Sequence, residues 1–187
     1  MTDSKQAEAP AGSGCGDLIK AALLAAKPGP SEAAEATGGL VRDQLLEASR
    51  NGHDILEAAA DAAKGIAAAA TKGAVTLWLA SRGATAGATL AAHELRRDAG
   101  PVVAVVTRTL VEELLTGDAD FGAAAKGSVQ GAIWGADLTG GEIDPAAACR
   151  AAARVAWETA VAKRASAGER VRHILRNPIE TYETGID

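Results

Sequence analysis

Small residues at every fourth position between residues 119 and 137 restrict the fold of this chain more than any other sequence feature. Ala123, Gly127, Gly131 and Gly135 would lie on one face of a helix and leave that face almost without side chains. A glycine inside a helix costs about 1 kcal/mol relative to alanine, so close packing against a second helix must offset the loss. The pattern therefore predicts a helix–helix contact of the small-xxx-small type.

Gly83 and Gly87 repeat the same four-residue spacing earlier in the chain. We expect helix 119–137 to pack against a helix over 54–81, either within the chain or in a second copy. The hydrophobic content of 48% includes only 3% aromatic residues, so an alanine-rich core buries little apolar area per residue. Burial between copies would add to it, which favours a homo-oligomer.

Caps and helix-breaking residues divide the chain into a series of helices, which predicts an all-α fold of antiparallel hairpins packed as a bundle. Ser31 is a candidate N-cap, and Gly38 and Gly39 are expected to weaken or break the helix that follows it. Gly168 is expected to separate the last two helices. The expected helices span residues 18–27, 32–37, 40–50, 54–81, 83–95, 101–115, 119–138, 145–166 and 169–176.

Residues 101–115 carry a run of β-branched side chains that is also typical of a buried strand. The length of the segment, Gly117 as a helix-ending residue and the absence of a partner strand favour a helix. The strand remains the alternative at this point. Asp118 or Asp120 is expected to cap the next helix.

The domain organisation follows from composition. Residues 1–16 are expected to form a disordered arm, residues 17–176 a single helical domain, and residues 177–187 an acidic tail. The segments AAKGIAAAATKG and AAKGSVQGAIWG suggest that a helical hairpin is duplicated at residues 54–97 and 119–166. The alternative is a chance similarity between alanine-rich sequences.

No residue pattern of the chain is typical of a catalytic, metal or cofactor site. His53, His93 and His173 lie in separate elements without metal-ligand spacing and are expected at the surface or at helix ends. Cys15 and Cys149 are far apart and form no CxxC motif. Cys149 follows the pattern of a small buried residue, although the adjacent arginine could lower the pKa of its thiol. No phosphate-binding loop is present, and we therefore expect no enzyme.

A basic block stands out in a chain whose formal net charge is −5. Seven basic residues and only two acidic ones lie between residues 145 and 176: Arg150, Arg154, Lys163, Arg164, Arg170, Arg172 and Arg176. The favoured interpretation is packing beside acidic helices of the same chain or of a neighbouring copy. The alternative is contact with an anionic surface, whereas nucleic-acid binding is disfavoured.

A membrane-spanning helix is not expected. The apolar stretch at residues 66–92 is interrupted by Lys72 and Arg82, which leaves pieces shorter than the roughly 20 apolar residues of a span. The N-terminal sequence lacks the basic and apolar regions of a secretory signal. We therefore expect a cytoplasmic location with reduced thiols.

The segments AAKGSVQGAIWGAD and DPAAACRAAARVAWETA resemble the Gly/Ala-rich helical hairpins of uncharacterised bacterial proteins. In size, low aromatic content and alanine-rich helices, residues 31–176 are also similar to phasins, the helical proteins that coat storage granules. The second resemblance implies an amphipathic helical oligomer on a hydrophobic granule.

Together these features predict a non-enzymatic structural or scaffold protein that self-associates through its small-residue helix faces. The alternative is a peripheral coat or binding protein of a phasin-like granule, an anionic membrane or a nucleic-acid surface, which would use the basic C-terminal helix.

Overall fold

The computed structural model describes residues 14–115, 120–177 and 179–186. This part of the chain is all-α, as predicted, and contains no strand apart from a single bridge between Ile179 and Tyr182. The expectations for residues 1–13, Gly117 and Asp118 lie outside the described residues. The helices are α1 (Cys15–Ala26), α2 (Ala33–Arg50), α3 (Ile55–Thr71), α4 (Leu77–Glu94), α5 (Ala99–Leu115), α6 (Phe121–Asp137), α7 (Pro145–Lys163) and α8 (Ala165–Leu175).

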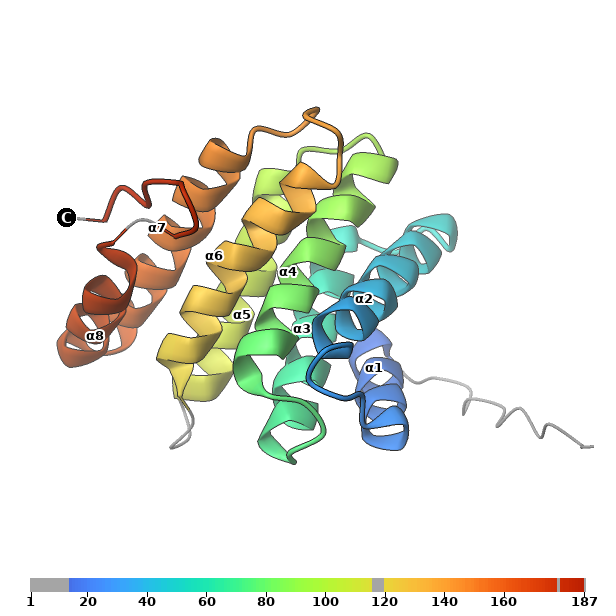
Figure 1. The fold of residues 1–187 in the computed structure, drawn as a ribbon. Coiled ribbons are helices and arrows are strands. Elements are labelled where there is room, and N and C mark those ends of the chain that lie inside the picture. The colour runs from blue at the N-terminus through green and yellow to red at the C-terminus, as the bar shows by residue number, and fades with distance from the viewer. Residues whose placement is uncertain (1–13, 116–119, 178, 187) are drawn as a thin grey trace, which may run out of the picture.

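The helices lie in two layers, with one helix of each antiparallel hairpin in each layer (Figure 1). Consecutive helices run in opposite directions, and the odd-numbered helices α1, α3, α5 and α7 pack side by side in one layer. The even-numbered helices α2, α4, α6 and α8 form the other layer. Neighbours within a layer therefore run parallel, as in a stack of helical hairpins. The two similar alanine-rich segments lie in different layers, on α3 and α6, and duplication stays a prediction.

Helix α4 has a small-residue face on the side that contacts α2. A Cβ atom added to Gly83 would lie well inside 3.0 Å of the carbonyl oxygen of Ala34, and one added to Gly87 would meet the carbonyl oxygen of Gly38 in the same way. Real Cβ atoms essentially never approach other atoms so closely. The glycines thus allow the two backbones to touch, and dispersion between backbone atoms replaces the missing side-chain contacts.

The opposite side of α4 receives the small-residue face of α6. Cβ atoms added to Gly127 and Gly131 would lie well inside 3.0 Å of the carbonyl oxygens of Trp78 and Arg82. Gly135 faces the following turns of α4 in the same close manner. The partner expected for helix 119–137, a helix over 54–81, is therefore wrong. The α6 helix packs against α4 (Leu77–Glu94), and the contact is made within one chain.

The prediction of one continuous helix over 54–81 is wrong, because this segment contains α3 and the start of α4. The chain leaves the helix after Thr71, where Gly73 has a φ of 75°, and returns to helical geometry at Leu77. The N–H groups of Gly73 and of the next residue donate to carbonyls of the last turn of α3, which is a Schellman motif. Gly83, near which the helix was expected to end or kink, lies inside α4.

Two further helix breaks were predicted at glycines, at Gly38 and Gly39 and at Gly168, and both predictions are wrong. Helix α2 continues through Gly38 and Gly39, because Gly38 is buried against α4, and this packing offsets the low helix propensity of glycine. The break between α7 and α8 falls at Arg164, whose backbone is extended (φ −158°, ψ 132°). Gly168 lies inside α8, where it allows close approach to Val161.

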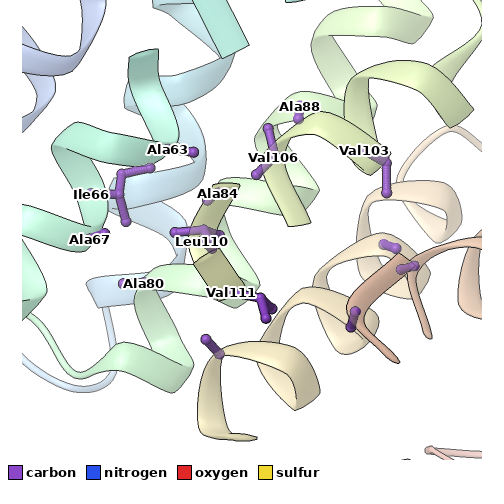
Figure 2. Packing of buried hydrophobic residues seen from close by; sticks show 14 of the residues in the cluster. Ala63, Ile66, Ala67, Ala80, Ala84, Ala88, Val103, Val106, Leu110 and Val111 are labelled. Atoms are coloured by element: carbon purple, nitrogen blue, oxygen red, sulfur yellow. The ribbon is translucent and has the colours of Figure 1, made fainter. Parts of the chain in front are cut away.

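Helix α5 resolves the ambiguity of residues 101–115 in favour of a helix. Its Val106, Leu110 and Val111 belong to one buried cluster together with Ile66 of α3 and Ala84 of α4 (Figure 2). Tertiary burial from several sides overrides the strand preference of the β-branched residues. The α5 helix therefore packs against four other helices, α3, α4, α6 and α7.

The two ends of the helical domain differ from the expectation. Helix α1 begins at Cys15, within the segment expected to be a disordered arm. The described part of the acidic tail packs on the bundle, because Ile179, Thr184 and Ile186 are buried. The Thr184 hydroxyl donates a hydrogen bond to the carbonyl of Leu175 at the end of α8, which satisfies one of the acceptors that a helix end leaves open.

Candidate ligand-binding site

A cavity of about 610 Å³ lies where α4 ends, α5 begins, and the turn after α6 leads into α7. In Figure 1 this is the upper end of the bundle, where the α4–α5 and α6–α7 connections lie together. Its apolar lining comes from α5, from α7 and from the turn before α7: Val103, Ile143, Ala147, Ala148 and Ala151. Its polar lining comes mainly from the two connections: His93, Arg96, Arg97, Asp98 and Glu142.

Short side chains on α7 create the space. Ala147, Ala148 and Ala151 occupy the first turns of α7, so that no long side chain fills the gap between α7 and α5. Asp144 caps α7 by accepting a hydrogen bond from the N–H of Ala146 at 2.9 Å. The cap and Pro145 at the first helical position hold the start of α7 beside the cavity.

His93 and Glu142 connect the two sides of the cavity mouth. The Nε2 atom of His93 lies 2.9 Å from Oε2 of Glu142. The His93 side chain is 29% exposed and that of Glu142 is 74% exposed. This pair links the last turn of α4 to the α6–α7 turn, and contributes little to stability because it is open to solvent.

Arg96 and Arg97 follow α4 directly and are both exposed. Among the described residues, neither guanidinium group makes a hydrogen bond or an ion pair. Asp98, which lines the same cavity, accepts a hydrogen bond from the N–H of Gly100 at 2.9 Å. The two acidic groups of the cavity therefore have partners, while its two permanent cations have none in the described chain.

The predicted packing residues lie elsewhere. Gly83, Gly87, Gly127, Gly131 and Gly135 are buried in the α2–α4 and α4–α6 contacts, and Ala123 is half-buried at the start of the α6 face. These faces are covered within one chain. Self-association of the protein stays a prediction.

The residues of the basic block are all exposed, and five of them have partners in the described chain. The contacts are Arg154 with Glu158, Lys163 with Glu112, Arg164 with the carbonyl of Leu115, Arg170 with Asp120, and Arg172 with Glu169. Arg150 and Arg176 complete the set on α7 and at the end of α8. Contact of this block with an anionic surface stays a prediction.

Two of the three tryptophans border the α4–α6 contact on the protein surface. The guanidinium carbon of Arg82 lies 5.1 Å from the ring centre of Trp134 and 6.0 Å from that of Trp78. The indole N–H of Trp78 donates to Oε1 of Gln130 at 2.5 Å. Both rings are half-buried, as is Trp157 on α7, which packs against the buried core. None of the three tryptophans is fully buried in the core.

The cysteines lie outside the cavity and are poor nucleophiles. Burial raises the pKa of the Cys149 thiol to about 11, and the smaller opposing effect of Arg150 does not reverse this. Burial, together with Asp61, also raises the pKa of Cys15. The described chain contains no group of three His, Cys, Asp or Glu side chains able to hold a metal ion.

The high pKa of Cys149 predicts slow alkylation. A rise from 9.0 to about 11 lowers the thiolate fraction at pH 8 by a factor on the order of 100. Iodoacetamide should therefore modify Cys149 about a hundredfold more slowly in the native protein than in guanidinium chloride, measured by peptide mass spectrometry after timed labelling. Equal rates in the two states would contradict the burial of this thiol.

Sequence reasoning missed the cavity because its polar residues belong to two distant turns. His93 was expected at a helix end, where it lies, but Glu142 follows it by 49 positions. The only local signal was the pair of arginines, Arg96 and Arg97, directly after the helix expected over 83–95. Arginines are common at the exposed C-terminal ends of helices, where their charge interacts favourably with the helix dipole. The pair therefore did not by itself indicate a binding site.

No helix of the described chain combines the length and the hydropathy needed to cross a membrane. Comparisons of the chain with models of protein families, with curated proteins and with solved structures find no match.

Proposed function

We propose that this protein is a non-enzymatic binding protein whose ligand, a small organic molecule, occupies the cavity at the α4–α5 end of the bundle. The observation that carries the proposal is the cavity itself. Its volume of about 610 Å³ falls within the roughly 300–1,000 Å³ typical of small-molecule sites. An apolar wall with a few polar groups at the mouth is also the usual composition of such sites.

The lining favours binding over catalysis. It includes no serine, cysteine, lysine or tyrosine, and the hydroxyl of its threonine, Thr89, donates a hydrogen bond to the carbonyl of Thr85 inside α4. The imidazole of His93 is engaged with Glu142 at the solvent-exposed mouth. A nucleophile with an adjacent base, which covalent catalysis requires, is therefore not supplied by these residues.

The scaffold and surface-binding functions suggested by the sequence have weaker support. The small-residue faces that would join two copies are covered by neighbouring helices of the same chain. Most of the basic residues that would face an anionic surface have acidic or carbonyl partners nearby. The cavity, in contrast, is open to solvent and is lined by residues of α4, α5 and α7 and of the turns between them.

The test uses N-phenyl-1-naphthylamine, a neutral apolar probe whose fluorescence rises in apolar surroundings. We expect saturable binding at one site per chain. Ala151 lines the cavity and is exposed, so Ala151→Trp can fill the cavity without entering the core. This variant should bind the probe at least about tenfold more weakly, a loss of about 1.4 kcal/mol.

Ala162→Trp is the matched control. Ala162 is also exposed on α7 but lies outside the cavity, so its replacement should leave the affinity unchanged. Absence of saturable binding to the wild-type protein, or equal affinity of the Ala151→Trp variant, would reject the proposed function.

A further inference from the structure

We propose that the ligand of this cavity is an organic anion with an apolar body, and that Arg96 and Arg97 bind its charged group. This inference rests on the proposed function and names the chemical class of the ligand. It is carried by two independent observations, one on the partners of the charged groups in the cavity and one on the backbone of Arg96.

The first observation is the distribution of partners. The cavity is lined by two arginines and two carboxylates. Each carboxylate has a partner, because Glu142 contacts His93 and Asp98 accepts the N–H of Gly100. Arg96 and Arg97 have no side-chain partner among the described residues. Their guanidinium groups are therefore the groups left available to an incoming anion.

The second observation is the residue that ends α4. Helices α2, α3 and α4 end in the same Schellman motif, in which the N–H groups of two successive residues bond back to the last helical turn. The left-handed position of this motif is Gly52 after α2 and Gly73 after α3, each with a φ of 75°. After α4 the same position is Arg96, with a φ of 53°.

An arginine at this position is less stable than a glycine would be. A side chain with φ > 0 is strained, whereas glycine adopts this conformation at no steric cost. Lys27 is the other cation that ends a helix in this conformation, with a φ of 42° after α1, and it lies outside the cavity. At α4 the strained cation is the one that lines the cavity, which indicates a role for its side chain there.

The rest of the lining defines the remaining part of the ligand. Val103, Ile143 and Ala148 offer an apolar surface next to the arginines. Guanidinium groups bind carboxylate, sulfonate and phosphate oxygens with paired N–H donors. An amphiphilic anion would place its charged group at the exposed arginines and its apolar body against α5 and α7.

The test compares two probes that differ by one charged group. The compound 8-anilinonaphthalene-1-sulfonate is N-phenyl-1-naphthylamine with an added sulfonate. We expect the wild-type protein to bind the sulfonate at least tenfold more tightly than the neutral probe. Arg96→Gly and Arg97→Gln should each lose most of this preference, because each should weaken binding of the sulfonate far more than binding of the neutral probe. Arg96→Gly should at the same time raise the thermal unfolding midpoint, because glycine relieves the strained φ.

Lys27→Gly is the matched control, since it also replaces a cation with glycine at a left-handed helix end. It should raise the unfolding midpoint and leave binding of both probes unchanged. Octanoate or octyl phosphate should displace the bound sulfonate probe, and 1-octanol should not. Whichever of the two anions displaces better identifies the charged group as carboxylate or phosphate.

The outcomes separate the inference from the proposed function. If the neutral probe binds but the sulfonate shows no preference, or if that preference survives in Arg96→Gly and Arg97→Gln, the anion inference is overturned and the cavity remains a binding site. If the neutral probe does not bind the wild-type protein, both proposals fail.

Discussion

Gly131→Leu is expected to lower the free energy of unfolding by about 4 kcal/mol or more, the range reserved for severe overpacking of a core. The Cβ atom alone would lie well inside 3.0 Å of the Arg82 carbonyl oxygen, in the α4–α6 contact. Because the clash is with backbone, no side-chain rotation can relieve it, and the two helices must separate. Urea unfolding followed by circular dichroism at 222 nm measures the effect.

Gly39→Leu provides the matched control for this substitution. Gly39 lies inside α2, is exposed, and has no atom within 4 Å of an added Cβ. Leucine should therefore stabilise α2 by up to about 1 kcal/mol through its better helix propensity. The two substitutions are chemically identical and should have effects of opposite sign. A similar change in both variants would mean that the α4–α6 contact is not as close as described.

Leu110→Ala is expected to lower the free energy of unfolding by about 2–5 kcal/mol. Leu110 is 1% exposed, and its side chain lies in the buried cluster on α5 (Figure 2). The surrounding residues include many alanines, which have no flexible side chains able to move into the space. The cavity left behind should therefore remain largely open, which places the loss in the upper part of this range.

Leu56→Ala tests whether burial is responsible for that loss. Leu56 lies in the first turn of α3 and is 36% exposed, so its truncation removes fewer contacts. We expect a loss of less than about 1 kcal/mol, partly offset by the higher helix propensity of alanine. If Leu110→Ala were no more destabilising than Leu56→Ala, α5 would not be the buried centre of the fold.

The all-α fold was predictable from local signals. Asp120, one of the two residues expected to cap α6, accepts a hydrogen bond from the N–H of Gly122, and Asp144 caps α7 in the same way. The helix expected over 40–50 ends as predicted, since α2 ends at Arg50 and Gly52 follows with a φ of 75°. Such signals act over a few residues, so one sequence is sufficient to read them.

Helix breaks at glycines were predicted poorly because a glycine in a helical segment can either end the helix or let a second helix pack closely against it. Gly38 and Gly168 continue their helices and allow close packing, whereas Gly73 ends a helix in the left-handed conformation. Helix propensity is similar for all three. Only the presence or absence of a neighbouring helix decides between these outcomes, and that neighbour is distant in sequence.

The sequence by itself determined that this chain forms helices and that some of them touch through glycine faces, because spacing at four residues places the small side chains on one side. Only the tertiary structure decided that Gly131 contacts Arg82 within one chain, and that His93 and Glu142 pair at the mouth of a cavity. These contacts join residues about 49 positions apart. They depend on how whole helices pack into two layers. That packing is set by the summed burial of many small side chains, so no single position of the sequence predicts it.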